Sequence, residues 1–205
     1  NDPNDRPWGW LSEADKAGGM LGASGAHYLD TLRWWLGDIR SVAGALSTRV
    51  PLRRLPDSSG MGKVDADDNF AVILRFASGA LGTIHVTATA GFDGDEEITI
   101  SGERGILMAR GGGLFGARTG DADLHEFPIT DEQEPGQTYR HYLVQPTAKL
   151  HRVWEHAIRT GEPGEPSFAD GVKIQEVIDA VARSGQQGRW IDTSGQRWQL
   201  GAHAV

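Results

Sequence analysis

The sequence predicts an α+β domain with a largely antiparallel sheet, and three observations lead to this prediction. Apolar residues recur at helical spacing in residues 18–37 and again in residues 147–184. Residues 39–127, by contrast, alternate with a period of two. Turn residues, and no helical stretch, separate the strand-like segments of this middle part. A run of strands flanked by helices favours antiparallel pairing over the parallel pairing of βαβ units.

Residues 18–37, GGMLGASGAHYLDTLRWWLG, are predicted to form the first helix, which ends at Gly37. The apolar positions return every three or four residues and form one stripe that comprises Leu21, Tyr28, Leu29, Leu32, Trp35 and Leu36.

Five strand-like stretches follow: IRSVAGALSTRV, DNFAVILRFA, ALGTIHVTAT, EEITIS and GILMAR. Ser78 and Gly79 form a two-residue connection, which predicts a hairpin between the second and third of them. Residues 51–65 contain several prolines and glycines and are expected to be a mobile connection.

Two helices are predicted near the C-terminus. The first ends at Gly161, with Pro163 beyond it, and carries the stripe Leu150, Val153, Trp154, Ala157 and Ile158. The second carries the stripe Ile174, Val177, Ile178, Val181 and Ala182.

The composition excludes several classes of protein. A net charge of -8 argues against nucleic acid or an anionic membrane as a partner. No apolar run approaches the roughly 18 residues that cross a bilayer, and no secretory signal pattern is visible. The chain has no cysteine, which excludes disulfides and thiolate metal sites. We therefore expect a globular protein of the cytoplasm.

Gly111, Gly113 and Gly116 spell the G-x-G-x-x-G pattern of dinucleotide-binding loops. That site also needs a helix directly after the loop, because the helix amides hold the pyrophosphate. The residues that follow, ARTGDADLHEF, have no helical stripe. We therefore interpret this segment as a glycine-rich turn between strands.

Residues 121–134 are acidic and could hold a hard metal ion, but their carboxylates lack a regular ligand spacing: Asp121, Asp123, Glu126, Asp131, Glu132 and Glu134. A solvated loop is the simpler interpretation, and we predict no metal site.

His27 is the candidate catalytic residue of the first helix. Helical spacing places Ala23, His27, Asp30 and Trp34 on a face roughly opposite the apolar stripe. An imidazole displayed beside a carboxylate suits proton transfer near neutral pH. The alternative is an ordinary surface histidine with an i,i+3 ion pair. No strand-like stretch precedes Gly18, as a phosphate loop would require, and no second histidine lies four residues from His27.

Four segments in order resemble the C-terminal domain of the Gfo/Idh/MocA oxidoreductases, a family that includes glucose–fructose oxidoreductase and inositol dehydrogenase. They are GGMLGASGAHYLDTLRWWLGDIRSV, DDNFAVILRFASGALGTI, ITISGERGIL and FADGVKIQEVIDAVARSGQQGRWI, and together they span nearly the whole chain.

The resemblance implies a large open sheet with helices on one face, as in the C-terminal domain of glyceraldehyde-3-phosphate dehydrogenase. It implies that residues 1–205 are a single substrate and oligomerisation domain, and that the N-terminal Rossmann domain, which binds NAD or NADP, is absent from this chain. We therefore expect the chain alone to bind no cofactor and to transfer no hydride. The implied substrate is a sugar, a polyol or a related hydroxy compound.

The resemblance also assigns roles to residues. His27 matches the family histidine that faces the substrate hydroxyl or carbonyl. The family often has an aspartate four residues earlier, where this chain has Ala23. Asp30 is then a candidate supporting carboxylate and substrate contact. Trp8, Trp10 and Trp34 are candidate substrate contacts, because flat indole rings suit the C–H faces of sugars; core packing is their alternative role.

Relatives pair through the open face of the sheet, so a homodimer or a higher homo-oligomer is expected. The alternation along residues 70–77 places Ile73 on this second face. Two other classes of function stay open. One is a non-catalytic carbohydrate-binding or assembly module, which Ala23 favours. The other is an unrelated metal-dependent enzyme that uses His27 and the acidic loop.

Overall fold

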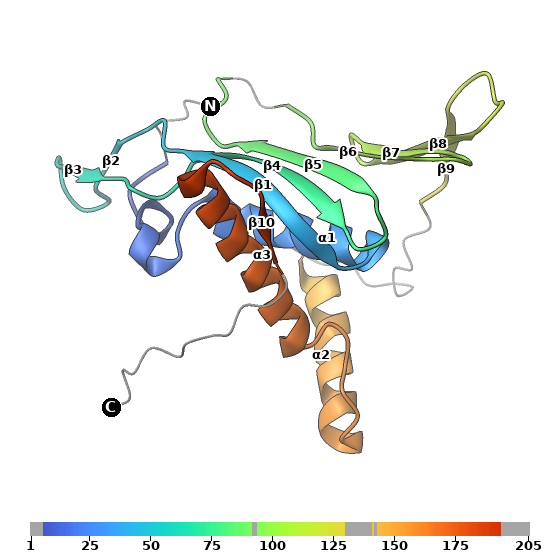
Figure 1. The fold of residues 1–205 in the computed structure, drawn as a ribbon. Helices are drawn as coiled ribbons and strands as arrows, with labels where there is room; N and C mark the ends of the chain where they lie inside the picture. The colour runs from blue at the N-terminus through green and yellow to red at the C-terminus, as the bar shows by residue number, and fades with distance from the viewer. Residues whose placement is uncertain (1–5, 92–93, 130–140, 142, 194–205) are drawn as a thin grey trace. The chain divides into compact units, whose positions relative to one another are not determined.

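The computed structural model describes residues 6–91, 94–129, 141 and 143–193. The chain divides into two compact units. The first unit comprises Asn1–Gly91 and Pro163–Val205, and the second comprises Phe92–Glu162 (Figure 1).

The first unit is built on a four-stranded antiparallel sheet in the order β10-β1-β4-β5. Its strands are β1 (Ile39–Ser47), β4 (Asn69–Phe76), β5 (Leu81–Thr87) and β10 (Ile191–Asp192). Strands β4 and β5 form the predicted hairpin, but its connection is longer than the predicted pair Ser78 and Gly79: residues 77–80 separate the two strands, and Gly79 has a φ of +91°. The predicted strands of this unit are thereby confirmed.

One face of this sheet is covered by the helices α1 (Ala26–Leu36) and α3 (Phe168–Gln187), which lie on the same side of it (Figure 1). Along β4 the residues are alternately buried and exposed, as the period of two predicts. The buried core of the unit comprises Leu21, Leu29, Ile39, Val42, Phe70, Val72, Leu74, Phe76, Ile174, Val177, Ala180, Val181 and Ile191.

The first predicted helix is confirmed, but it does not begin as an α-helix. Leu21–Gly25 form a π-helical turn, η3, and regular α-helix starts only at Ala26. Gly37 ends α1 with a φ of +88° and donates its N–H to the carbonyl oxygen of Arg33. A π turn contains one residue more than an α turn, and such turns recur at functional sites.

Two carboxylates connect the end of α1 to the start of α3. Arg33 donates from Nε to Asp38 Oδ1 at 2.8 Å and from a terminal nitrogen to Asp170 Oδ1 at 2.9 Å. Asp170 also completes a capping box with Ser167 at the N-terminus of α3. Lys173 donates to Asp38, and this hydrogen bond, together with Arg33, lowers the pKa of Asp38. Asp38 is therefore bound by Arg33 of α1 and Lys173 of α3, and Asp170 is bound by Arg33 of α1 and by Ser167 at the N-terminus of α3.

With Asp170→Asn, the free energy of unfolding is expected to fall less steeply as the pH is lowered into the acid range. The backbone N–H and the hydroxyl of Ser167, and then Arg33, lower the pKa of Asp170 from 3.8 to about 2. Since the folded-state pKa lies below the unfolded value, the ionised carboxylate stabilises the fold above pH 3.8, and this contribution disappears as the pH falls towards about 2. Urea unfolding across this window should show a steeper decline for the wild type than for the variant. Equal slopes would contradict the role given to Asp170.

The first unit also contains a two-stranded antiparallel ribbon of β2 (Leu52–Arg54) and β3 (Met61–Lys63). The expectation of a mobile connection over residues 51–65 is therefore wrong for these strands. Two 3₁₀ turns, η1 (Trp10–Ser12) and η2 (Ala14–Lys16), precede the first helix. Asp65 Oδ1 accepts the N–H of Ala14 at 2.8 Å and holds the second of these turns.

The second unit contains another four-stranded antiparallel sheet, in the order β6-β7-β8-β9, and one helix. Its elements are β6 (Glu97–Gly102), β7 (Gly105–Arg110), β8 (Gly113–Arg118), β9 (His125–Phe127) and α2 (Val144–Thr160). The sequence predicted β6, β7 and α2 but not β8 or β9. Gly161 ends α2 with a φ of +75°, as the sequence predicted.

The fold class is confirmed as α+β with antiparallel sheets, although the described strands are distributed over two four-stranded sheets and a ribbon. Within the described ranges, no helix has the length and apolar character that crossing a membrane requires.

Candidate functional site

His27 lies in the first turn of α1, directly after the π turn, and its side chain is exposed. Leu29, two residues later, is fully buried under the sheet. Trp34 is 79% exposed, two turns from His27 and nearly in line with it along the helix. Asp30 lies between them, slightly to one side, and is partly exposed. The structure therefore presents His27, Asp30 and Trp34 on one side of α1, away from the core.

In the described part of the chain, neither His27 nor Asp30 has a hydrogen bond or an ion pair from its side chain. The i,i+3 ion pair of the alternative interpretation, an ordinary surface histidine, is thus not formed. Ala23 has no polar side-chain atom, so no carboxylate is supplied from the turn before His27. This leaves the imidazole free to meet a ligand on the exposed side of the helix.

The N-terminus of this helical segment is bound by a carboxylate of the same chain. Asp67 accepts hydrogen bonds from two successive backbone amides. The N–H of Met20 donates to the main-chain carbonyl oxygen of Asp67 at 2.9 Å, and the N–H of Leu21 donates to its carboxylate oxygen Oδ2 at 2.9 Å. Burial raises the pKa of Asp67, and the amides of Leu21 and Met20 act in the opposite direction. The amides that a phosphate would need are therefore occupied.

The glycines before His27 serve this packing. Gly19 has a φ of +103°, and a Cβ atom there would collide with the Asp67 carboxylate. A Cβ atom on Gly18 would collide with the carbonyl oxygen of Trp10, and one on Gly25 would lie 3.0 Å from Cζ of Phe70. The glycine-rich start of the helix is therefore a packing feature and not a phosphate loop.

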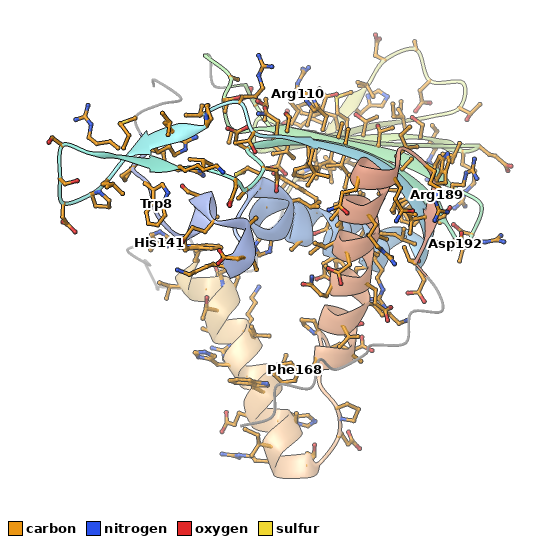
Figure 2. The ribbon with its side chains drawn as sticks, turned by 60° about the vertical axis from the view of Figure 1, so that its left-hand side comes forward. Trp8, Arg110, His141, Phe168, Arg189 and Asp192 are labelled. Atoms are coloured by element: carbon orange, nitrogen blue, oxygen red, sulfur yellow. The ribbon has the colours of Figure 1, made fainter. Side chains whose placement is uncertain are left out.

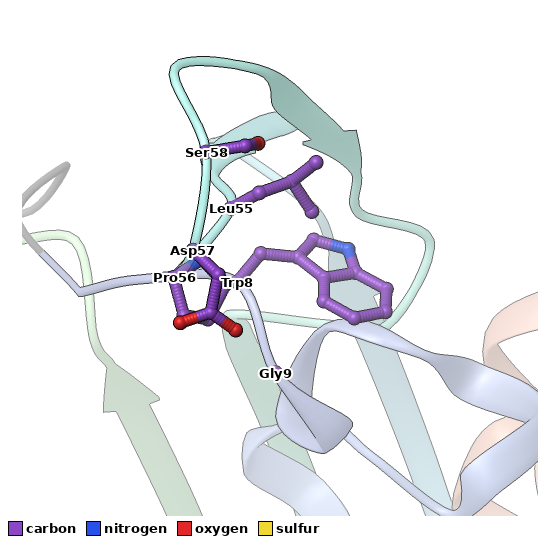
Figure 3. Close-up of a pocket in the computed structure, with 6 residues that line it drawn as sticks. All are labelled: Trp8, Gly9, Leu55, Pro56, Asp57 and Ser58. Carbon is purple, nitrogen blue, oxygen red and sulfur yellow. The ribbon is translucent and has the colours of Figure 1, made fainter.

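Trp8 is anchored to the ribbon of β2 and β3. Its Nε1 donates to the carbonyl oxygen of Lys63 at 2.8 Å, and its ring lies against Gly62, where a Cβ atom would be 2.5 Å from Cδ1 of the indole. The indole lines a shallow, open pocket of about 420 Å³ (Figure 3). The lining residues are Trp8, Gly9, Leu55, Pro56, Asp57 and Ser58.

His27, Asp30 and Trp34 do not line this pocket, so it does not unite Trp8 with the other predicted substrate residues. Trp10 begins the 3₁₀ turn η1 and is 57% exposed. Figure 2 labels Trp8 near the ribbon, on a different element from the helix that carries His27.

The glycine-rich segment around Gly111 and the acidic segment 121–134 both have structural roles. Gly111 and Gly112, with φ values of +57° and +77°, form the turn between β7 and β8, and Gly113 and Gly116 belong to β8 itself. In the acidic segment, Asp121 accepts the N–H of Arg118 at 2.8 Å. Of this segment, residues 130–134 lie outside the described residues. No cluster of three or more metal-ligating side chains occurs in the described residues.

Comparison with known proteins identifies what this fold is similar to. Residues 1–193 match the profile of the C-terminal alpha/beta domain of the GFO/IDH/MocA oxidoreductase family. Levoglucosan dehydrogenase of Pseudarthrobacter phenanthrenivorans is 30% identical over 220 residues, which cover 93% of this chain and 56% of that protein. The human glucose-fructose oxidoreductase domain-containing protein 2 is 27% identical and covers 89% of this chain and 52% of its own length.

Comparison with solved structures also finds oxidoreductases. Levoglucosan dehydrogenase in complex with NADH and levoglucosan matches with a TM-score of 0.78 and 26% identity, over 95% of this chain and 55% of that one. An oxidoreductase domain protein from Kribbella flavida matches with a TM-score of 0.79 and 29% identity, over 95% and 56% of the two chains. The chain thus spans a little more than half the length of the proteins it matches.

Proposed function

This chain belongs to the Gfo/Idh/MocA oxidoreductase family as its C-terminal α/β domain, and on that premise we propose that it is the substrate-binding half of an NAD(P)-dependent dehydrogenase. The proposed substrate is a sugar, a polyol or a related hydroxy compound. The relative that is 30% identical is named levoglucosan dehydrogenase, and a solved form of levoglucosan dehydrogenase contains NADH and levoglucosan.

One observation supports this function above the others: His27 is exposed on the side of α1 opposite the core, and no intrachain partner engages its imidazole in the described residues. Such an imidazole can accept the proton that a substrate hydroxyl loses on oxidation. Asp30 and Trp34 follow it along the same side of the helix, where they can contact the hydroxyl groups and the C–H face of a sugar ring.

Two features argue against a dinucleotide site in the part of the chain that the structure describes. The G-x-G-x-x-G pattern is part of a β-hairpin, and Asp67 occupies the amides at the start of the helix that carries His27. We therefore propose that a Rossmann domain outside these 205 residues binds the cofactor. We also propose that the enzyme is cytoplasmic.

The test compares this chain alone with the enzyme that carries its nucleotide-binding half. The longer protein should reduce NAD or NADP in the presence of levoglucosan or another member of a panel of sugars, inositols and sugar acids. The 205-residue chain should reduce neither cofactor, and calorimetric titration of this chain with NAD and NADP should show no binding. Micromolar binding of either cofactor by the chain alone would contradict the assignment.

The second candidate function is a non-catalytic carbohydrate-binding module of the same fold, and Ala23 favours it because the helix lacks the acid that the family often places there. The longer protein would then bind a sugar, seen as a change in tryptophan fluorescence, without turnover in the presence of either cofactor.

We further propose that the uncovered face of the first sheet pairs with a second copy of the chain. Ile73 on β4 lies opposite Ala43 of β1 and Thr83 of β5, and all three point away from α1 and α3. Ile73 is 46% exposed. A two-fold axis through this face would bury apolar side chains from both copies.

A further inference from the structure

We propose that Asp67 is a positioning residue, which fixes the direction in which His27 is displayed by binding the first amides of the helical segment. The proposal rests on the function proposed above, because it concerns the same histidine. In the described residues, Asp67 accepts hydrogen bonds from the backbone of Met20 and Leu21 and not from the imidazole of His27. It acts through the backbone of residues 20–26.

Asp67 is itself firmly held. It directly precedes Asp68, which is fully buried and accepts the N–H groups of Arg49 at 2.7 Å and Val50 at 2.9 Å. The next residue, Asn69, begins β4, whose register with β1 is continuous along Asn69–Arg75. Met20 donates to the main-chain carbonyl of Asp67 and Leu21 donates to its carboxylate, so both hydrogen bonds attach the helix start to the residues that lead into β4.

The first α-helical turn after the π turn is held independently. Leu29 is fully buried in the core, and it fixes the rotation of α1 about its axis. Between these two attachments lies the π turn Leu21–Gly25, which contains one residue more than an α-helix would need. Because each residue of an α-helix turns the chain by about 100°, the extra residue reconciles two attachment points that a continuous α-helix could not satisfy together.

His27 is the second residue after this turn, so a change in the geometry of the π turn would move the backbone of His27 before that of later residues in the helix. If Asp67 releases Leu21, the turn can revert to α geometry and the backbone near His27 must shift. The imidazole would then point in a different direction although the helix remains formed.

Gly19 provides an independent way to disturb the same contact. Its φ of +103° and its contact with Asp67 leave no room for a side chain. Gly19→Ala should therefore displace the Asp67 carboxylate and produce the same change at His27 as Asp67→Ala. The double variant should add little to either single change, because both remove one interaction.

The test uses NMR of the 205-residue chain under strongly native conditions. Asp67→Ala and Gly19→Ala should both move the imidazole resonances of His27 and the amide resonances of residues 21–27, whereas His85 on β5 should be unaffected. Asp67→Asn should restore most of the wild-type spectrum, since its amide oxygen can still accept the Leu21 N–H. Asp65→Ala is the matched control, because Asp65 binds Ala14 outside the helix.

In the enzyme with its nucleotide-binding half, Asp67→Ala should lower kcat by about 10- to 100-fold, on the scale of a misplaced catalytic group. The KM for the nicotinamide cofactor should not change. Wild-type His27 resonances in a folded Asp67→Ala protein would overturn the proposal and leave Asp67 as a structural anchor. If the resonances move as expected but His27 proves dispensable for turnover, the positioning role stands and the proposed function fails.

Discussion

His27→Asn is expected to lower kcat by about 100-fold or more in the enzyme that carries its nucleotide-binding half. Asparagine approximates the shape of the imidazole but cannot take up a proton, so the variant should still bind the substrate and lose the proton-transfer step. The KM for the sugar should therefore change much less than kcat. Steady-state kinetics with the best substrate of the panel provides the measurement.

His85→Asn is the control for this experiment, because His85 is also exposed but lies on β5, on the uncovered face of the sheet. It should retain wild-type turnover. Near-normal turnover of His27→Asn would identify His27 as an ordinary surface histidine and would favour the non-catalytic binding module.

Ile73→Asp is expected to weaken self-association by about 100-fold or more. If the uncovered face pairs across a two-fold axis, each dimer would bury two like charges among apolar side chains, at a cost of several kcal/mol. Sedimentation velocity over a range of micromolar concentrations measures the shift from dimer to monomer. The wild-type chain should be a dimer in the tens of micromolar.

Val172→Asp is the matched control. Val172 on α3 is 48% exposed, close to the 46% of Ile73, but it points away from the sheet on the opposite side of its helix from the core. It should leave the dimer intact. A wild-type chain that sediments as a monomer would remove the proposed interface, and equal effects of both variants would attribute the change to surface charge alone.

The main elements of the fold are predictable because their periodicity records burial directly. In β4 the residues with even numbers from Phe70 to Phe76 are buried and the odd ones are exposed, so the alternation in the sequence is the burial pattern itself. The stripe of α3 works in the same way, since Ile174, Val177 and Val181 are all buried.

The missed elements lack such a signal. The strands β2 and β3 have three residues each, too few to show a period. Strand β8 contains Gly113 and Gly116, which weaken the strand pattern, so that the sequence favours a turn there. The ladder with β7 decides their conformation, and that ladder depends on residues of another strand.

The candidate site was only partly predictable for a similar reason. Helical spacing correctly placed His27, Asp30 and Trp34 on the outer side of α1, because that spacing is local. The partner of the helix start, Asp67, is 46 residues away from Leu21 in the chain, and the π turn has no sequence signature of its own. The paired glycines at 18 and 19 are the one local signal, since such a pair before a helix indicates a close approach by another group.

The chain order of the first unit has a consequence for synthesis on the ribosome. Strands β1, β4 and β5 emerge early, but α3, which covers their apolar face, follows only after the whole second unit, Phe92–Glu162, has been translated. At ordinary elongation rates these roughly 70 residues take about 4 to 14 seconds. During that time Phe70, Val72 and Leu74 have only the first helix as cover, so a nascent chain at this length presents a hydrophobic surface of the kind that chaperones bind.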